Sequence, residues 1–285
     1  MPTHRLGILL VMASAIAWST TGLFTRILTL DTATMLVWRG IFGAIGLIVV
    51  LLALQGRTGL RGFWHLGPAG LGYAVVSAFG MLCFIAALGL TTVAHVAIIY
   101  AMAPFLAAAL GWFVLREAPT RSAAIAAVVA FAGAVYMIGM GREGTLIGAL
   151  LAFGMTAAMA LMMVMGRRYP AIPTLPAAAA SALFSALVAL PFASATLPAA
   201  PDLAILVAFG LVNSALGLAL FLMGSRHITP VETALIGALD APLAPLWVWI
   251  MFAERPSTQT LIGGAIVFAA VFWHILASSR TGAPA

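Results

Sequence analysis

The chain has no lysine and few charged side chains of any kind. Charged residues make up 7% of its 285 residues, whereas hydrophobic residues make up 64%. Soluble domains carry about one quarter charged residues, because water-facing surface has to be solvated. A chain this poor in charge cannot cover a globule of its size with polar groups. Its outer surface is therefore expected to face lipid.

Other absences narrow the function. The one cysteine, Cys83, excludes an intramolecular disulfide. The sequence contains no GxxxxGK[ST] motif, so ATP-driven transport by this chain is not predicted. It also contains no HExxH, CxxC or GxSxG motif and no cluster of histidines with carboxylates, so no metal, cofactor or catalysis is predicted. The formal net charge is +6, because 13 arginines outnumber 7 acidic residues. We interpret the arginines as topology signals in loops. No nucleic-acid partner is expected.

Long apolar runs predict membrane-spanning helices. The runs last about 20 residues without the alternation of a β-barrel, which is the length that a helix needs to cross a bilayer. The expected spans are 6–28, 33–54, 67–89, 94–115, 121–140, 145–166, 174–193, 202–224, 231–253 and 258–278. Residues 1–15 also resemble a secretory signal, but the apolar run continues to Leu28, so we interpret it as the first span.

Arginine counts predict the orientation of these spans. With the N-terminus inside, nine loop arginines are cytoplasmic: Arg5, Arg57, Arg61, Arg116, Arg121, Arg167, Arg168, Arg226 and Arg280. Three are external: Arg26, Arg142 and Arg255. By the positive-inside rule this excess places both termini in the cytoplasm.

The two halves of the chain repeat each other at an offset of 137 residues. The segment 84–120 aligns without gaps on 221–257, and Trp112, Glu117 and Pro119 fall on Trp249, Glu254 and Pro256. We therefore expect two five-helix repeats, residues 1–142 and 143–285. Because five is odd, the second repeat enters the membrane from the opposite face. Inverted repeats are typical of alternating-access transporters, whose substrate binds near the midplane between the repeats.

The segments AMAPFLAAALGWFVLREAPT and ALDAPLAPLWVWIMFAERPST, together with Arg39 in the second span, resemble the drug/metabolite transporter superfamily, specifically its EamA-like exporters. The chain is most similar in appearance to the amino-acid exporters of this group, including exporters of aromatic amino acids. The resemblance implies that spans 1–4 and 6–9 surround a central cavity, with spans 5 and 10 peripheral. It implies an exporter of amino acids or related small metabolites in the lipid bilayer of a bacterial inner membrane, as a monomer or weak homodimer.

Prolines inside spans are the first candidate functional residues. Pro104, Pro242 and Pro245 each remove a helix hydrogen bond. Because they recur at nearly corresponding places in both halves, a gating role is expected, and a passive kink packed against neighbouring helices is the alternative.

Two charged residues lie inside spans. Asp240 is expected near the middle of the ninth span, either binding a proton or a substrate amine or capping the helix that restarts at Pro242. Arg39 lies about 10 Å into the second span at 1.5 Å per residue. It either holds a substrate carboxylate, or has a structural role in which it forms an internal ion pair or binds backbone carbonyls. His95 and Glu232 share one register of the repeat, where caps and surface groups are more usual than ligands.

Aromatic, methionine and amide side chains complete the candidate site. Those expected at mid-span depth are Trp18, Phe79, Tyr100, Met155, Met159, Met163, Asn213 and Ser214. The three methionines, spaced four apart, share one helix face that either lines an adaptable apolar cavity or packs against neighbours. Asn213 and Ser214 either bond between helices or meet substrate.

Other functional classes stay open at this stage. They are a transporter of another metabolite or drug class in the same superfamily, an intramembrane enzyme such as a lipid-modifying transferase, and a channel or scaffold. An intramembrane enzyme would need a cluster of reactive groups at one depth, which the sequence does not offer.

Overall fold

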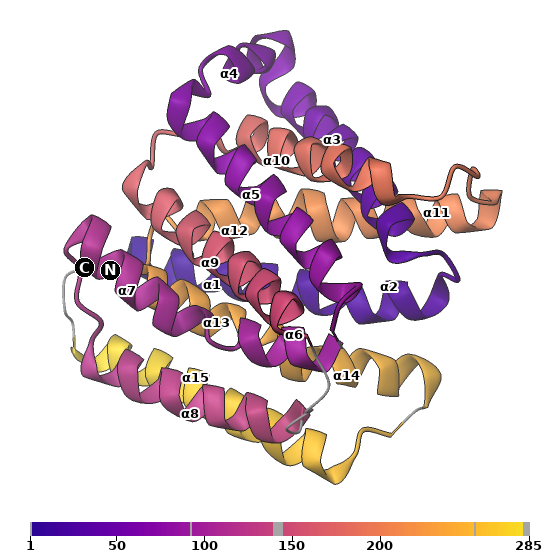
Figure 1. Cartoon of the computed structure of the whole chain (residues 1–285). Helices are drawn as coiled ribbons and strands as arrows, with labels where there is room; N and C mark the ends of the chain where they lie inside the picture. The colour runs from indigo at the N-terminus through magenta and orange to yellow at the C-terminus, as the bar shows by residue number, and fades with distance from the viewer. Residues whose placement is uncertain (1, 92, 139–144, 254, 282–285) are drawn as a thin grey trace.

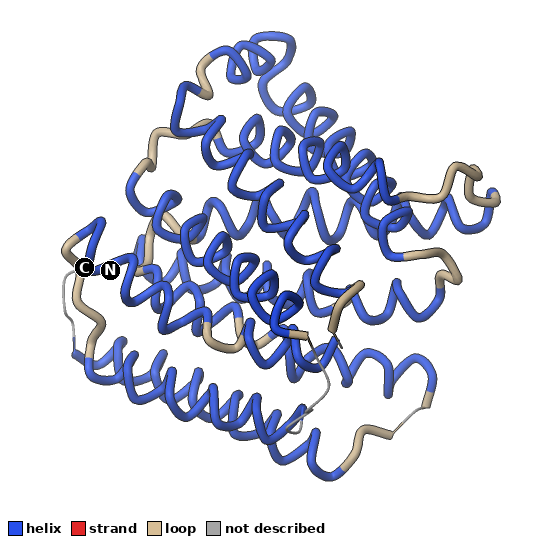
Figure 2. Tube along the Cα trace, viewed as in Figure 1, coloured by secondary structure: helices blue, strands red, loops and turns tan. Residues whose placement is uncertain are grey.

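The computed structural model describes residues 2–91, 93–138, 145–253 and 255–281, and within these ranges the chain is helical and has no strands (Figure 2). Nine described stretches are long and apolar enough to cross a membrane, and a shorter apolar helix, Arg121–Met137, provides the tenth. The predicted all-α membrane bundle is confirmed. The predictions for Arg142 and Glu254 lie outside the described residues.

The first half contains five spans, two of which consist of two helices each (Figure 1). Its elements are α1 (Pro2–Ser19), α2 (Thr21–Ile27), α3 (Thr32–Gln55), η1 (Gly56–Leu60), α4 (Arg61–Trp64), α5 (Gly67–Leu88), α6 (Val93–Tyr100), α7 (Ala103–Leu115) and α8 (Arg121–Ile138). Asp31 caps α3 by accepting a bond from the Thr34 amide at 2.8 Å. Burial alone would raise the pKa of Asp31, but its hydrogen bonds from Thr34 outweigh burial and lower it.

The second half repeats this order with different interruptions. Its elements are α9 (Leu146–Arg168), α10 (Thr174–Ala189), η2 (Leu190–Phe192), α11 (Ala200–Phe209), the π-helical η3 (Gly210–Gly217), α12 (Leu218–Gly224), α13 (Pro230–Gly237), α14 (Asp240–Phe252) and α15 (Thr258–Thr281). The predicted spans therefore correspond to observed helices, with ends that differ by a few residues.

Equivalent spans of the two halves pack against each other in opposite directions. In the fifth pair, the start of α15 meets the end of α8, where Gln259 donates to the Tyr136 carbonyl at 2.7 Å. In the second pair, the Ser194 amide beyond α10 donates to the Thr34 hydroxyl at the start of α3, at 2.8 Å. The two halves are therefore inverted relative to each other, and Figure 1 shows α8 and α15 side by side along one edge.

The remaining contacts follow the same pseudo-two-fold relation. α5 packs against α9, and its counterpart is the packing of α12 and η3 against α1. α7 packs against α9, and its counterpart is the packing of α14 against α1 and α2. Two packed pairs of spans result. One pair is the α6/α7 span with α9, and the equivalent pair, in the opposite orientation, is the α13/α14 span with the α1/α2 span.

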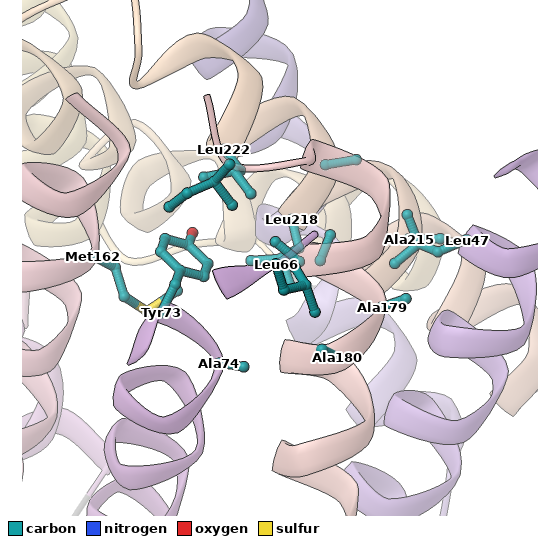
Figure 3. Packing of buried hydrophobic residues seen from close by; sticks show 14 residues of the cluster. Leu47, Leu66, Tyr73, Ala74, Met162, Ala179, Ala180, Ala215, Leu218 and Leu222 are labelled. Atoms are coloured by element: carbon teal, nitrogen blue, oxygen red, sulfur yellow. The ribbon is translucent and has the colours of Figure 1, made fainter. Parts of the chain in front are cut away.

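Small residues allow these helices to approach closely. A Cβ added at Gly40 of α3 would lie 2.6 Å from the Ala182 carbonyl oxygen and 2.8 Å from the Ala186 Cβ of α10. Helices in lipid gain stability from van der Waals contact rather than from water exclusion, so small interface residues are favoured. The cluster around the buried ring of Tyr73 joins α3, α5, α9, α10 and α12 (Figure 3).

The first span is interrupted where one continuous helix was expected. Ser19, Thr20 and Thr21 each donate their hydroxyl to the carbonyl three residues earlier, at 2.7, 2.6 and 2.6 Å. Such bonds compete with the helical ladder and bend it, so α1 ends at Ser19 without a proline. The eighth span likewise contains η3 where a plain helix was expected.

Candidate functional site

Two spans are broken at the same register of the repeat. Residues 101–102 separate α6 from α7, residues 238–239 separate α13 from α14, and all four helix bounds recur at an offset of 137. The second helix of each pair is followed by a residue with positive φ, Arg116 at 61° and Ala253 at 56°. A break inside a membrane exposes unpaired backbone groups and helix-end charge, and such breaks form substrate sites in transporters.

The prolines explain both breaks. A proline ring crowds the carbonyl four residues earlier and offers no N–H to it. For Pro104 and Pro242 these carbonyls belong to Tyr100 and Ala238, which adjoin the two breaks. Pro245 lies inside α14. The structure thus places Pro104 and Pro242 at the breaks but Pro245 within a continuous helix, and the gating role of all three stays a prediction.

Asp240 is the first residue of α14 and is half-buried beside the second break. Its carboxylate accepts a hydrogen bond from the Ala241 amide. The N-cap position belongs to Leu239, which has no side-chain cap. In the described part of the chain, no basic side chain pairs with Asp240, and the Tyr100 hydroxyl lies near enough to interact with its charge.

Arg39 is also half-buried and has no acidic partner among the described residues. Its guanidinium carbon lies 5.5 Å from the ring centroid of Phe209, the last residue of α11. Its Nε is shielded from solvent and makes no hydrogen bond to the described residues. The internal ion pair considered for Arg39 is therefore not found there, and a cation–π contact is present instead.

An aromatic and methionine cluster adjoins Asp240 through Tyr100. Tyr100, Met159 and Trp18 pack against a buried group that includes Met163 and Phe221. The rings of Trp18 and Phe221 are 4.9 Å apart. Trp18 lies on α1, which packs on η3 and on α14. η3 in turn packs on α3, the helix of Arg39, and α14 begins at Asp240.

Asn213, at the centre of η3, joins this cluster through hydrogen bonds. Its amide donates to the Ala17 carbonyl at 3.0 Å, and its side-chain oxygen accepts from the Thr21 hydroxyl at 3.1 Å. The Trp18 indole donates to the Asn213 carbonyl at 3.0 Å. Of the two roles considered for Asn213, interhelical bonding is observed. π-helical segments often mark functional sites.

Phe79 is not brought to this cluster. Its side chain is 54% exposed on α5, where with Val75 and Leu82 it lines a shallow apolar groove against α10. This surface faces lipid in a membrane bundle. Met155 packs near Ala87 and is separated from Met159 and Met163.

The two ends of the broken spans are packed differently. α7 packs along α13 at one end of the bundle, and a Cβ added at Gly111 would lie 3.9 Å from the Pro230 Cβ. At the opposite end, the equivalent helices α6 and α14 make at most a marginal contact within the described residues. All eight residues of α13 are buried. We call the α7–α13 end the packed end and the α6–α14 end the open end.

Charged side chains also connect helices at the packed end. Arg167 at the end of α9 donates to the Glu117 carboxylate beyond α7 at 3.3 Å, and to the Arg226 carbonyl at 3.1 Å. The Arg226 guanidinium donates to the Ile172 carbonyl. Burial lowers the pKa of Arg226, although an arginine remains charged.

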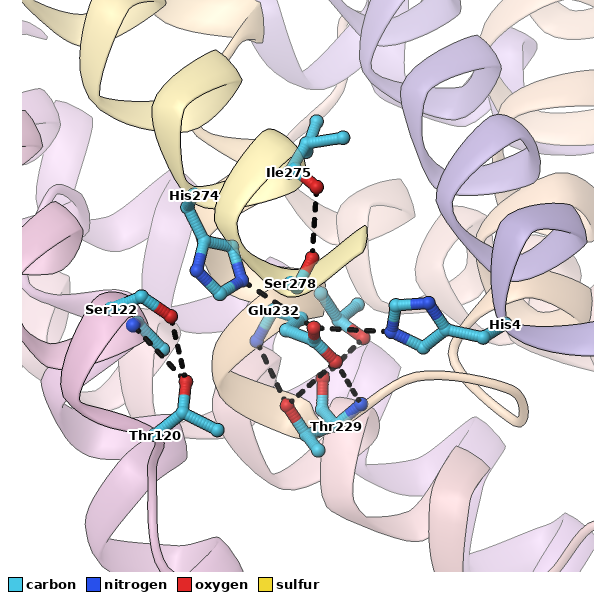
Figure 4. Close-up of polar contacts among 10 residues, drawn as sticks. His4, Thr120, Ser122, Thr229, Glu232, His274, Ile275 and Ser278 are labelled. Carbon is cyan, nitrogen blue, oxygen red and sulfur yellow. Dashed lines mark hydrogen bonds and ion pairs between the residues drawn. The ribbon is translucent and has the colours of Figure 1, made fainter. Parts of the chain in front are cut away.

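The sequence did not reveal the partners of Glu232. As expected for a helix start, Glu232 completes a capping box with Thr229 at the beginning of α13. His4 and His274 also lie within 3.2 and 3.4 Å of its carboxylate (Figure 4). They come from opposite ends of the chain, so no local motif signals the contact. His95, at the equivalent register, bonds to Thr91.

The inverted halves, the paired helix breaks and the charged residues without charged partners among the described residues, Asp240 beside one break and Arg39 against Phe209, are the features of a membrane transporter for small molecules. The EamA-like transporter family model matches the chain twice, over residues 5–139 and 146–276. The chain therefore belongs to the EamA-like transporter family, whose members are transporters rather than enzymes. One solved crystal structure of a protein is similar at a TM-score of 0.83 with 19% identity, over 97% of this chain and 99% of that one. At this identity the likeness shows the fold alone. No curated protein matches the chain.

Proposed function

We propose that this transporter exports amino acids or related small metabolites across a bacterial inner membrane. The observation that carries the proposal is the pair of oppositely charged, half-buried side chains, Arg39 and Asp240, without charged partners among the described residues. An amino acid is a zwitterion of complementary charge. Its carboxylate would bind Arg39 and its ammonium group Asp240.

The energetic reason is desolvation. A charge held inside a membrane bundle without a partner is costly, and such residues mark substrate or ion pathways. A zwitterionic substrate also loses hydration free energy when it leaves water. Pairing its charges with the charged side chains offsets this loss for both the substrate and the protein. At the second break, the carbonyl groups at the C-terminal end of α13 add hydrogen-bond acceptors for the ammonium group.

The substrate side chain would meet the cluster of Trp18, Tyr100 and Met159. Methionine is flexible and polarizable, so a surface containing it accommodates different apolar shapes. This supports a site that accepts several amino acids.

Alternating access would use the two packed pairs of helices. One pair is the α6/α7 span with α9, and the other is the α13/α14 span with α1/α2. Rocking one against the other would separate α7 from α13 at the packed end and bring α6 to α14 at the open end. The open end faces outward in this proposal, because the arginine-rich loops lie at the packed end. The energy would come from the substrate gradient or from proton exchange.

Topology is tested by labelling. Cysteines placed near Arg57, Arg121 and Arg168 should be protected from an impermeant thiol reagent in intact cells, and those near Arg142 and Arg255 should react. The physical reason is the arginine excess on one side. The experiment uses a Cys83→Ala background. External labelling near Arg121 together with protection near Arg255 would reject the proposed orientation.

Selectivity is tested by competition. Purified protein in liposomes should take up a radiolabelled apolar amino acid with saturating kinetics, and several amino acids with neutral side chains should inhibit this uptake. Saturation separates a transporter from a channel, and recovery of unchanged substrate separates it from an enzyme. Inhibition by a sugar phosphate or nucleotide sugar alone would reject the amino-acid proposal and leave the family membership intact.

A further inference from the structure

Three titratable side chains from three different helices meet at the packed end. Glu232 of α13 is 8% exposed. Its Oε1 lies 3.2 Å from His4 Nε2 of α1 and 3.4 Å from His274 Nε2 of α15 (Figure 4). His274 is 1% exposed, and neither of its ring nitrogens makes a hydrogen bond to the described residues, so its contact with Glu232 is at ion-pair distance only.

The capping box does not require these histidines. The other carboxylate oxygen, Oε2, accepts from the Thr229 amide and hydroxyl at 3.1 Å each, and this already satisfies the start of α13. Oε1 is left for the two imidazoles. A buried carboxylate with an oxygen directed at two imidazoles interacts far more strongly when they are charged.

Other charged groups around α13 are directed elsewhere. On α7 and α9, Glu117 and Arg167 pair with each other. In the loop before α13, Arg226 bonds to a backbone carbonyl, and His227 lies beside Gly7 of α1. The other described arginines on these elements are exposed at helix ends: Arg5 on α1, Arg116 after α7, Arg121 on α8 and Arg168 on α9. The two imidazoles are therefore the titratable groups that face Glu232 in the described part of the chain.

We propose that His4, Glu232 and His274 form a proton-binding site that holds the packed end closed. Imidazole is the side chain whose charge changes between about pH 5 and 8. When the imidazoles are protonated, they attract the Glu232 carboxylate and tie α1 and α15 to the start of α13. Because α15 packs along α8 of the first half, the His274 contact ties α13 to the first half, whereas the His4 contact lies within one packed pair. Above the pH range in which imidazole is charged this attraction is lost, and α13 is freed to move away from the first half, which includes α7. The stabilisation of the closed end is thus present at acid pH and absent at alkaline pH.

The side chains at the equivalent register of the first half are different. The residue equivalent to Glu232 is His95, which bonds to the Thr91 hydroxyl at 3.1 Å, and the residue equivalent to His274 is Met137. The inference goes beyond the proposed substrate and does not depend on it.

Spin-label distances test the proposal without any substrate. Labels at Leu9→Cys on α1 and Tyr169→Cys beyond α9, both exposed positions, are placed in a Cys83→Ala background. In nanodiscs, the ratio of short-distance to long-distance populations should fall about tenfold from pH 5.5 to 8.5, which corresponds to a one-unit difference in proton affinity between the two conformations. In Glu232→Gln the change should be less than about twofold, since glutamine retains the capping box but not the charge.

Two further variants make the result decisive. His4→Gln, at a side chain that is 28% exposed, should reduce the pH response in part, because the other imidazole remains. Glu117→Gln breaks the other ion pair of the packed end, and because its partner Arg167 does not titrate in this range, the pH response should remain. A wild-type distribution that is the same at both pH values overturns the proposal. So does a full pH response in both Glu232→Gln and His4→Gln.

Discussion

Replacing Asp240 with asparagine is expected to reduce amino-acid uptake into liposomes about 10- to 100-fold, while the protein remains abundant in the membrane. A hydrogen bond to a charged group contributes about 1.5–3 kcal/mol, and this contact with the substrate ammonium would be lost. Asparagine caps helices about as well as aspartate, so a purely structural Asp240 would tolerate the change. Uptake at wild-type rates across pH 6 to 8 would reject both the proton-site and the amine-site hypotheses.

A matched control is available in the same chain. Asp202 stands in the first turn of α11, as Asp240 stands in the first turn of α14. Asp202→Asn should leave uptake within about twofold of the wild type, because surface substitutions away from a site change little. Equal losses in both variants would point to a general effect on folding or insertion rather than to substrate binding.

Cross-linking α7 to α13 is expected to abolish transport reversibly. Cysteines at Gly111 and Pro230 would have Cβ atoms about 3.9 Å apart, which suits a disulfide. An oxidised bond would hold the packed end closed, so uptake should fall to background and return on reduction. Undiminished uptake by a fully cross-linked sample would show that this end does not open during transport.

The control for this experiment is a cross-link within one packed pair. A Cβ added at Gly22 of α2 would lie 4.0 Å from the Ala244 Cβ of α14. These helices belong to the pair that moves together in the proposed mechanism, so the oxidised Gly22→Cys/Ala244→Cys protein should retain transport. Loss of transport in both disulfides would favour a general intolerance of oxidation over closure of a gate.

The offset between the two halves could be predicted from the sequence because equivalent segments carry matching residues. Trp112 and Trp249 set the offset of 137 residues, and the breaks before α7 and α14 obey it to the residue. A proline has no N–H to offer and crowds the carbonyl four residues earlier, and this local effect accounts for the breaks beside Pro104 and Pro242, although Pro245 is accommodated within α14. Such local effects can be read from one segment alone.

Features that depend on distant residues could not be predicted in this way. The contact between Arg39 and Phe209 joins two halves of the chain, and the three partners of the proton site lie at residues 4, 232 and 274. Phe79 was expected at mid-span depth, and depth alone does not tell which face of a helix meets lipid. Rotation about the helix axis is set by neighbouring helices rather than by the segment itself.

The contact of Gly111 with Pro230 has a consequence for the opposite state of the transporter. A closure at the open end that mirrored the packed end would place Val248 where Gly111 stands and Val93 where Pro230 stands. Two branched side chains hold helix backbones farther apart than a glycine facing a proline ring does. In the proposed orientation, the closure on the outer side would therefore be less tightly packed than the one on the inner side. An empty transporter with this difference would favour the outward-facing state, and substrate binding would have to supply the free energy of the inward-facing one.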